Sequence, residues 1–244
     1  MSNTTAGLCS VIQCIEDAAI KAQRDINDVK LIAVSKTFPV EVIYDAWQAG
    51  QKRFGENRLQ DAISKIRTLK EILKSKYGQI EKSELPEWHF IGRIQGNKTK
   101  QIAENFSWVH SVDSIRLAEK ISNARPKTMP PINVCLQLNL EEEVSKGGIS
   151  KEEIVSISRE IIKLPGIQYR GLMAIPKYEE DPEAMRSKFR AIREILHCLQ
   201  SKHSFKIDTL SMGMSGDYKV AIEEGATMVR IGTAIFGERK SVFQ

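Results

Sequence analysis

One lysine stands where it could act as a nucleophile. Lys36 follows a nearly continuous apolar run, residues 29–34, with only Ser35 between them. An amine at the end of such a run loses part of its hydration, and desolvation favours the neutral form. A neutral amine can condense with an aldehyde to form a Schiff base. The alternative is that the long side chain simply extends into water from the end of a buried strand.

Glycine and hydroxyl-bearing residues form two clusters in the C-terminal part of the chain. Their members are Ser211, Gly213, Ser215 and Gly216 in the first, and Gly232 and Thr233 in the second. Backbone N–H groups and hydroxyls bind phosphate, and glycine lets the main chain approach closely. Ordinary turns explain isolated glycines, but two clusters that both carry hydroxyls favour a phosphate site. With Lys36 they indicate a phosphorylated aldehyde, either pyridoxal phosphate or the substrate of a sugar-phosphate aldolase.

Alternating strand-like and helix-like stretches would position these residues. After a helix at about 4–24, strands are predicted at 29–34, 52–55, 88–91, 108–112, 133–139, 168–173, 209–211 and 228–231. Helices are predicted from Pro39, at about 59–75, 98–105, from an N-cap at Ser114 to 124, 151–163, 185–199, 217–224 and from Thr233. The alternation predicts an α/β fold, a single (β/α)8 TIM barrel with an extra N-terminal helix. A doubly wound open sheet is the alternative, since the pattern does not show closure.

The predicted barrel places the candidate residues together. We expect one domain over residues 1–244, with residues 1–28 as a helical extension packed on the barrel. In such barrels the functional side chains collect at the C-terminal ends of the strands. Lys36 follows the first predicted strand, and the two hydroxyl clusters follow the seventh and the eighth. The amine and the phosphate site should therefore share one mouth.

Composition argues against several other classes of function. The 244 residues are 41% hydrophobic and 27% charged, as in soluble globular proteins. No apolar run approaches the roughly 20 residues that span a bilayer, and the N-terminus lacks the features of a secretory signal, so we expect a cytoplasmic protein. The cysteines and histidines show no metal-ligand spacing, so reduced cysteines and no metal site are expected. Basic residues alternate with acidic ones despite the net charge of +5, which argues against a nucleic-acid partner.

Several motifs occur in a characteristic order along the chain. They are Val34-Ser35-Lys36, Phe54-Gly55-Glu56-Asn57, Trp88-His89-Phe90-Ile91-Gly92, Gln95 with Asn97-Lys98, Gly171-Leu172-Met173, Ser211-Met212-Gly213-Met214-Ser215 and Val229-Arg230-Ile231-Gly232-Thr233. In this order the chain resembles the pyridoxal phosphate homeostasis proteins, the YggS/PROSC family, from about Val29 to Gly237. The resemblance implies a barrel similar to the N-terminal domain of alanine racemase, with pyridoxal 5′-phosphate as its cofactor.

The resemblance also implies a role for each candidate residue. Lys36 would carry the Schiff base, and Arg230 would lie at the pyridine nitrogen. An arginine leaves that nitrogen unprotonated and weakens the cofactor as an electron sink. The other implied contacts are Ser211, Ser215, Gly232 and Thr233 around the phosphate, Asn57 as a polar contact and Met173 as an apolar wall. An ion pair with Glu56 at the barrel mouth is the alternative for Arg230.

Five positions depart from the family pattern. They are Arg58 in place of an aromatic residue, Arg93 in place of proline or a small residue, and Gly96, Gly147 and Gly216 in place of two serines and an acid. We expect cofactor binding to survive these changes, because none touches Lys36 or Arg230. Gly147 should loosen the loop around Lys146, which is not counted among the site residues.

Two classes of function follow from the resemblance. The first is a protein of intracellular vitamin B6 homeostasis that buffers pyridoxal phosphate or delivers it to apoenzymes. The second is an amino-acid racemase, which needs an acid–base group on each face of the cofactor. Lys36 could serve one face, but no second base is evident, and only seven residues follow Gly237 where such racemases carry a second domain. We therefore predict a monomeric carrier with no catalytic residue and no robust catalytic activity.

Overall fold

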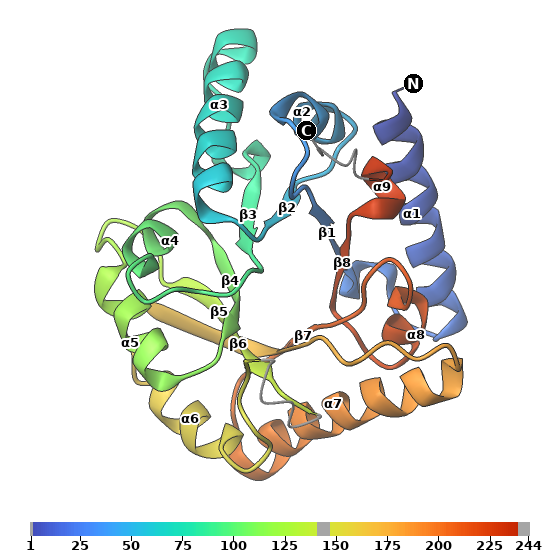
Figure 1. Ribbon diagram of the computed structural model, residues 1–244, viewed down its shortest axis with the longest axis vertical. Coiled ribbons are helices and arrows are strands. Elements are labelled where there is room, and N and C mark those ends of the chain that lie inside the picture. The colour runs from blue at the N-terminus through green and yellow to red at the C-terminus, as the bar shows by residue number, and fades with distance from the viewer. Residues whose placement is uncertain (1, 141–146, 239–244) are drawn as a thin grey trace, which may run out of the picture.

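A closed barrel of eight parallel strands forms the centre of the molecule (Figure 1). The computed structural model describes residues 2–140 and 147–238. The strands are β1 Lys30–Val34, β2 Arg53–Glu56, β3 Glu87–Phe90, β4 Trp108–Val112, β5 Ile132–Leu138, β6 Ile167–Ala174, β7 Thr209–Ser211 and β8 Met228–Ile231. Pairing of β1 with β8, from Lys30 opposite Met228 to Ala33 opposite Ile231, closes the barrel. The predicted (β/α)8 barrel is confirmed, and the open doubly wound sheet is wrong.

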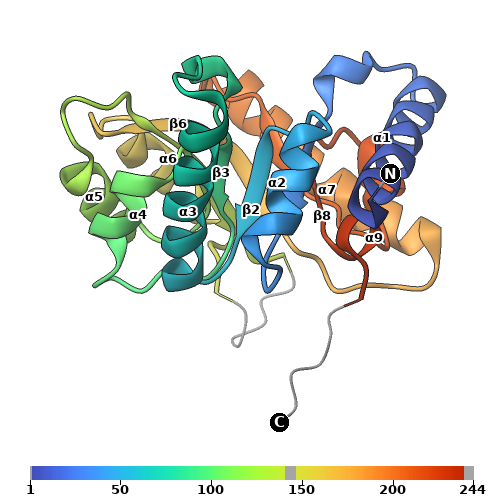
Figure 2. The ribbon, with the colours of Figure 1, turned by 90° about the horizontal axis from the view of Figure 1, so that it is seen from above.

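Helices surround the barrel on its outer face (Figure 2). They are α1 Asn3–Lys21, α2 Val40–Gln48, α3 Leu59–Tyr77, α4 Thr99–Asn105, α5 Ile115–Ala124, α6 Ile154–Ile161, α7 Pro182–His203, α8 Tyr218–Glu223 and α9 Thr233–Phe236, with 3-10 turns at Ile26–Asp28 and Lys82–Glu84. Two predicted details are wrong. Residues 151–153 form a turn before α6. Ser114 occupies the N-cap position of α5, but its hydroxyl donates to the Asp113 carboxylate at 3.3 Å and caps no backbone group.

The hydrophobic core has two parts. The larger part lies between the strands and the helices and includes the fully buried Ile43, Phe54 and Phe189. The smaller part contains Ile32, Trp108, Cys135, Met173 and Met228. Successive strand residues point to opposite faces, so this second cluster fills the barrel interior while the neighbours of its members pack against the helices.

The N-terminal helix α1 covers one side of the barrel, beside α8 and α9 (Figure 1). Its apolar face buries Leu8, Val11 and Ile15. Further along, the guanidinium of Arg24 donates at 2.8 Å to the carbonyl oxygens of Ile222 and of Ala226, which tie the chain after α1 to the end of α8. The extension predicted over residues 1–28 thus comprises α1 and the first 3-10 turn, packed on the C-terminal elements.

Within residues 2–140 and 147–238, no helix combines the length and the apolar character that crossing a bilayer requires. Nor do three or more His, Cys, Asp or Glu side chains gather there in an arrangement that could hold a metal ion. All four cysteines are unpaired thiols.

Candidate functional site

A cavity of about 440 Å³ opens at the carboxyl ends of the strands, which all face the same side of the molecule (Figure 2). Its volume falls in the range of small-molecule sites. Several residues predicted from the sequence line it: Lys36, Asn57, Ser215, Arg230, Gly232 and Thr233. Closure of the barrel therefore brings the ends of β1, β2, β7 and β8 to one mouth, as the sequence predicted.

Two predicted site residues do not line this cavity. Met173 is 1% exposed and belongs to the interior cluster. Ser211 is fully buried, and its hydroxyl is bonded within the barrel. Both side chains point into the barrel rather than into its mouth, so the predicted apolar wall and phosphate contact are not placed there. The apolar lining comes from residues that the sequence did not single out, namely Val34, Phe38, Ile91, Ile175 and Met214.

Lys36 occupies a tight turn directly after β1. It is half-buried, and the next residue, Thr37, has a φ of 70°, in the left-handed region that residues other than glycine seldom adopt. The turn is closed by the Phe38 N–H, which donates to the Ser35 carbonyl at 3.1 Å. Local strain of this kind persists only where the surroundings hold the backbone in place.

A buried ion pair supplies that support. Lys65 on α3 donates to Glu56 Oε1 at 2.8 Å and to the Ser35 carbonyl at 2.9 Å, and the Ser35 hydroxyl donates to the same carboxylate oxygen at 2.6 Å. Burial raises the pKa of Glu56, while Lys65 and Ser35 oppose the shift. The residue before Lys36 is thus held through both its side chain and its main chain. Sequence reasoning assigned Glu56 no such role and missed Lys65, because nothing in the chain places α3 beside this turn.

Arg230 on β8 carries a buried positive charge at the inner side of the cavity. Its Nη1 donates to the Ser211 carbonyl at 2.6 Å and to the Ser211 hydroxyl at 2.7 Å, and its Nη2 donates to the Ala174 carbonyl at 3.1 Å. Burial lowers the pKa of Arg230 to about 10, and Asp217 opposes this, so the guanidinium stays charged at neutral pH. The alternative ion pair with Glu56 is wrong, because that carboxylate pairs with Lys65.

The two hydroxyl-bearing loops flank the cavity. In the loop after β7, Gly213 has a φ of 91°, and a Cβ there would lie 2.7 Å from the Cβ of Ala221. Only glycine suits that position, and the Asp217 carboxylate fixes the turn by accepting from the Met214 N–H at 2.6 Å. In the loop after β8, α9 begins at Thr233. The first N–H groups of a helix lack intrahelical partners, so this end presents donors beside its hydroxyl.

Asn57 adds an acceptor to the same cavity. Its Oδ1 is buried, and no described residue donates a hydrogen bond to it. An unsatisfied buried acceptor costs about 1–3 kcal/mol. A ligand that donates a hydrogen bond to Asn57 Oδ1 would remove that cost. The unsatisfied oxygen is therefore consistent with a polar ligand in the cavity.

The departures from the family pattern lie mostly away from this cavity. Gly216 lines it. Arg58 and Arg93 line an adjoining cavity of about 780 Å³, which Asn57 also borders. Gly147 borders another cavity of about 340 Å³, and Gly96 is exposed. Lys146, in the loop that Gly147 was expected to loosen, lies outside the described residues.

Similarity to known proteins identifies the family. The sequence model for the alanine racemase N-terminal domain matches residues 15–240. A pyridoxal phosphate homeostasis protein of Pseudomonas aeruginosa is 45% identical over 98% of this chain and 97% of its own, and one of Vibrio cholerae is 47% identical over 92% of each. The chain belongs to the pyridoxal phosphate homeostasis protein family. The resemblance inferred from the ordered motifs is confirmed.

Solved structures extend the likeness to three dimensions. PipY of Synechococcus elongatus, solved with pyridoxal phosphate bound, is 33% identical with a TM-score of 0.76, and the match covers 92% of this chain and 100% of PipY. An unknown protein from Bifidobacterium adolescentis, also 33% identical, has a TM-score of 0.86 over 96% of this chain and 94% of its own. Alanine racemase from Corynebacterium glutamicum is 17% identical with a TM-score of 0.65, and the match covers 100% of this chain and 63% of the racemase. That last likeness concerns the fold alone.

Proposed function

We propose that this protein binds pyridoxal 5′-phosphate as a Schiff base on Lys36 and serves intracellular cofactor homeostasis, without robust catalytic activity. One observation carries the proposal: a single cavity unites the Lys36 amine, the Arg230 guanidinium and the hydroxyl-bearing loops after β7 and β8. The relatives named for pyridoxal phosphate homeostasis and the pyridoxal phosphate bound to PipY support it.

Each group of the cofactor has a matching group in the cavity. The Lys36 amine would attack the aldehyde carbon, so that a C=N bond replaces the C=O bond and one water leaves. The Ser215 and Thr233 hydroxyls, with nearby backbone N–H groups, suit the phosphate. Asn57 would contribute a polar contact. Met173 and Ser211 would act from behind the cavity, since neither lines it.

The cavity favours retention of the cofactor over catalysis. A charged arginine does not yield its proton, so Arg230 would keep the pyridine nitrogen unprotonated and limit the ability of the ring to accept electrons. Among the described residues that line the cavity there is no tyrosine, histidine, cysteine or carboxylate. Two-base racemisation requires a proton-transfer group on each face, and Lys36 could supply one. Delivery to apoenzymes, by a monomer in the cytoplasm, completes the proposal.

Visible absorbance of the purified protein during titration with pyridoxal phosphate tests the proposal. Wild type should turn yellow, and borohydride reduction should leave a cofactor adduct that peptide mass spectrometry locates on Lys36. Lys36→Ala should lack both, while Lys219→Ala, which removes an exposed lysine on α8, should match wild type. Colourless wild type at saturating cofactor, or an unchanged band in Lys36→Ala, would refute Schiff-base binding. Exchange of the α-proton of alanine that requires both cofactor and Lys36 would refute the absence of catalysis and favour a racemase.

A further inference from the structure

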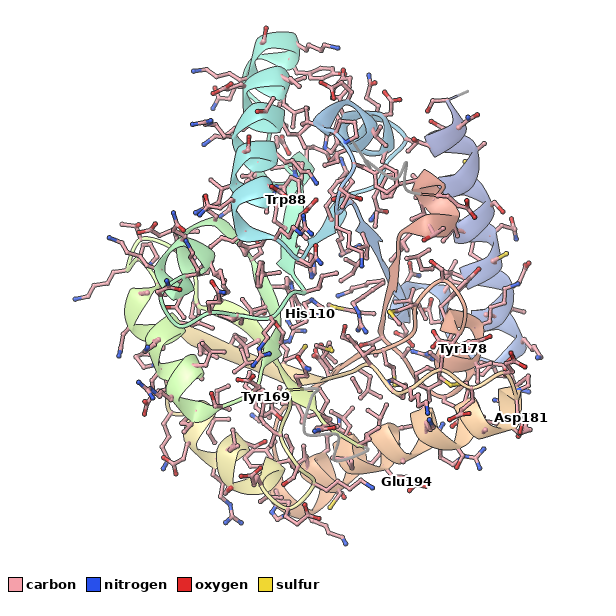
Figure 3. All side chains as sticks on the ribbon, viewed as in Figure 1. Trp88, His110, Tyr169, Tyr178, Asp181 and Glu194 are labelled. Carbon is pink, nitrogen blue, oxygen red and sulfur yellow. The ribbon has the colours of Figure 1, made fainter. Side chains whose placement is uncertain are left out.

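A line of buried hydrogen bonds crosses the barrel interior from the cavity to the opposite face. Starting at Arg230, Nη1 lies 2.7 Å from the Ser211 hydroxyl, which lies 2.8 Å from His110 Nδ1. His110 Nε2 lies 2.9 Å from His89 Nδ1, and His89 Nε2 lies 2.9 Å from Glu87 Oε1. Figure 3 shows His110 inside the ring of strands. Glu87 is the first residue of β3, so the line ends at the face opposite the cavity.

Hydrogen-bonding chemistry assigns a direction to every link. Arginine only donates, so the Ser211 oxygen accepts from Arg230. The Ser211 oxygen can accept twice, so the remaining directions are set at the other end of the line. The Glu87 carboxylate only accepts, so His89 donates to it from Nε2. A neutral His89 then accepts on Nδ1 from His110 Nε2, and a neutral His110 accepts on Nδ1 from the one hydroxyl proton of Ser211. All four bonds therefore run the same way, from the guanidinium to the carboxylate.

Burial favours this arrangement of charges. Both imidazoles are fully buried, and burial lowers the pKa of His89 and holds the pKa of His110 well below its ordinary value. Burial also acts to raise the pKa of Glu87, but the His89 contact outweighs it with help from Arg53 and Lys30, so the net shift is downward. At neutral pH two neutral rings thus connect a buried cation to a partly exposed anion. Each ring turns its lone-pair nitrogen towards Arg230, the orientation that stabilises a cation.

We propose that His110 and His89 are positioning residues. They orient the Ser211 hydroxyl so that its lone pair faces Arg230. This arrangement fixes the guanidinium at the ring nitrogen of the cofactor. This inference rests on the proposed function. Main-chain carbonyls also hold Arg230, but they do not control the hydroxyl, which rotates freely without an acceptor. With His110 in place, the hydroxyl proton is drawn away from the guanidinium. The two histidines thus act on the cofactor through Ser211 and Arg230 and do not touch it.

Paired substitutions at His110 separate this role from simple packing. His110→Leu keeps the bulk of the side chain but removes both ring nitrogens, whereas the Oδ1 of His110→Asn can stand in for Nδ1 as the acceptor. His110→Leu and Ser211→Ala should weaken pyridoxal phosphate binding about tenfold, the typical effect of leaving a buried polar group unpaired. Both should also shift the visible absorbance band. His110→Asn should move the affinity and the band back towards those of wild type, because it keeps an acceptor for Ser211 but loses the Nε2 donor to His89. Ser158→Ala, which removes a fully buried hydroxyl bonded to Tyr169 at 3.0 Å, is the control for loss of a buried serine.

Nitrogen-15 NMR of the cofactor-free protein tests the direction of the bonds without any cofactor. His110 and His89 should both carry their proton on Nε2 at neutral pH. A proton on His110 Nδ1, or wild-type affinity and absorbance in folded His110→Leu and Ser211→Ala, would overturn this inference alone. Wild-type protein that binds no pyridoxal phosphate would refute the proposed function and the inference with it. If His110→Leu does not fold, the Ser211→Ala titration and the NMR spectrum decide.

Discussion

Exchange of Glu56 for glutamine should destabilise the fold far more than the loss of a surface ion pair. The Glu56 side chain is 1% exposed and that of Lys65 is 12% exposed, so the substitution leaves an ammonium group buried without its counter-charge. Breaking a buried pair in this way costs about 3–5 kcal/mol. Lys65 keeps its bond to the Ser35 carbonyl, which places the expected loss of unfolding free energy near the lower limit, at about 3 kcal/mol.

Urea denaturation of the cofactor-free protein measures this loss. The measurement is made at about pH 8, because burial raises the pKa of the Glu56 carboxyl and a higher pH favours its ionised form. The double variant Glu56→Gln with Lys65→Met should lose less than the sum of the single variants, since it leaves no buried charge uncompensated. Glu160→Gln is the matched control: Glu160 pairs with Lys163 at a similar 2.8 Å, but both side chains are more than half exposed, so the cost should stay below about 1 kcal/mol. Equal losses in Glu56→Gln and Glu160→Gln, or strict additivity in the double variant, would refute the reasoning.

Two further predictions concern buried titratable groups. His89 and His110 have lowered pKa values in the folded state, so the unfolded chain takes up protons first as the pH falls. The contribution of these neutral histidines to the free energy of unfolding is present above about pH 6.5. Below that pH it is lost by up to about 1.4 kcal/mol per pH unit for each histidine. Urea denaturation from pH 7 to 5 should show this slope, and His110→Leu should remove the part due to His110; an equal slope in the two proteins would contradict it. Burial raises the pKa of the Cys135 thiol to about 12, so iodoacetamide should label exposed Cys9 in the folded protein and Cys135 only after unfolding. Peptide mass spectrometry reads both sites, and rapid labelling of native Cys135 would count against its burial.

The fold followed from the sequence because each strand of a barrel is a local pattern. Short apolar runs such as residues 108–112 are buried on both faces, and they separate helices with one apolar side. The start of a helix does not follow from residue type alone, since it depends on where a side chain can reach the backbone. Ser114 shows this: its residue type suits a cap, but the hydroxyl turns to the neighbouring carboxylate. Closure of the barrel depends on the pairing of β1 with β8, two strands that are distant in the chain. The periodicity of the sequence does not predict that pairing.

The sequence predicted which residues lie at the strand ends, and therefore near the site. It did not predict which way their side chains point. Lys36, Gly232 and Thr233 follow strand ends, and a parallel barrel gathers such ends at one mouth. Whether a residue near the end of a strand faces the mouth or the interior depends on the stagger of the closed barrel. Met173 and Ser211 are buried near the ends of their strands, so position along the strand did not predict which way their side chains point. Their contacts with the cofactor stay predictions.

The line from Arg230 to Glu87 shows why a site can extend beyond its cavity. Glu87 and His89 are two residues apart on β3, so they share a face, and this spacing is the one local signal of the line. The other links join β3 to β4, β4 to β7 and β7 to β8, and three-dimensional closure alone brings them together. A barrel interior usually holds branched apolar side chains. Here two imidazoles occupy it, and burying them costs little because every ring nitrogen has a partner. The polar groups of the interior therefore support one buried cation, the Arg230 guanidinium. Substitutions of these groups should be judged by their effect on that guanidinium.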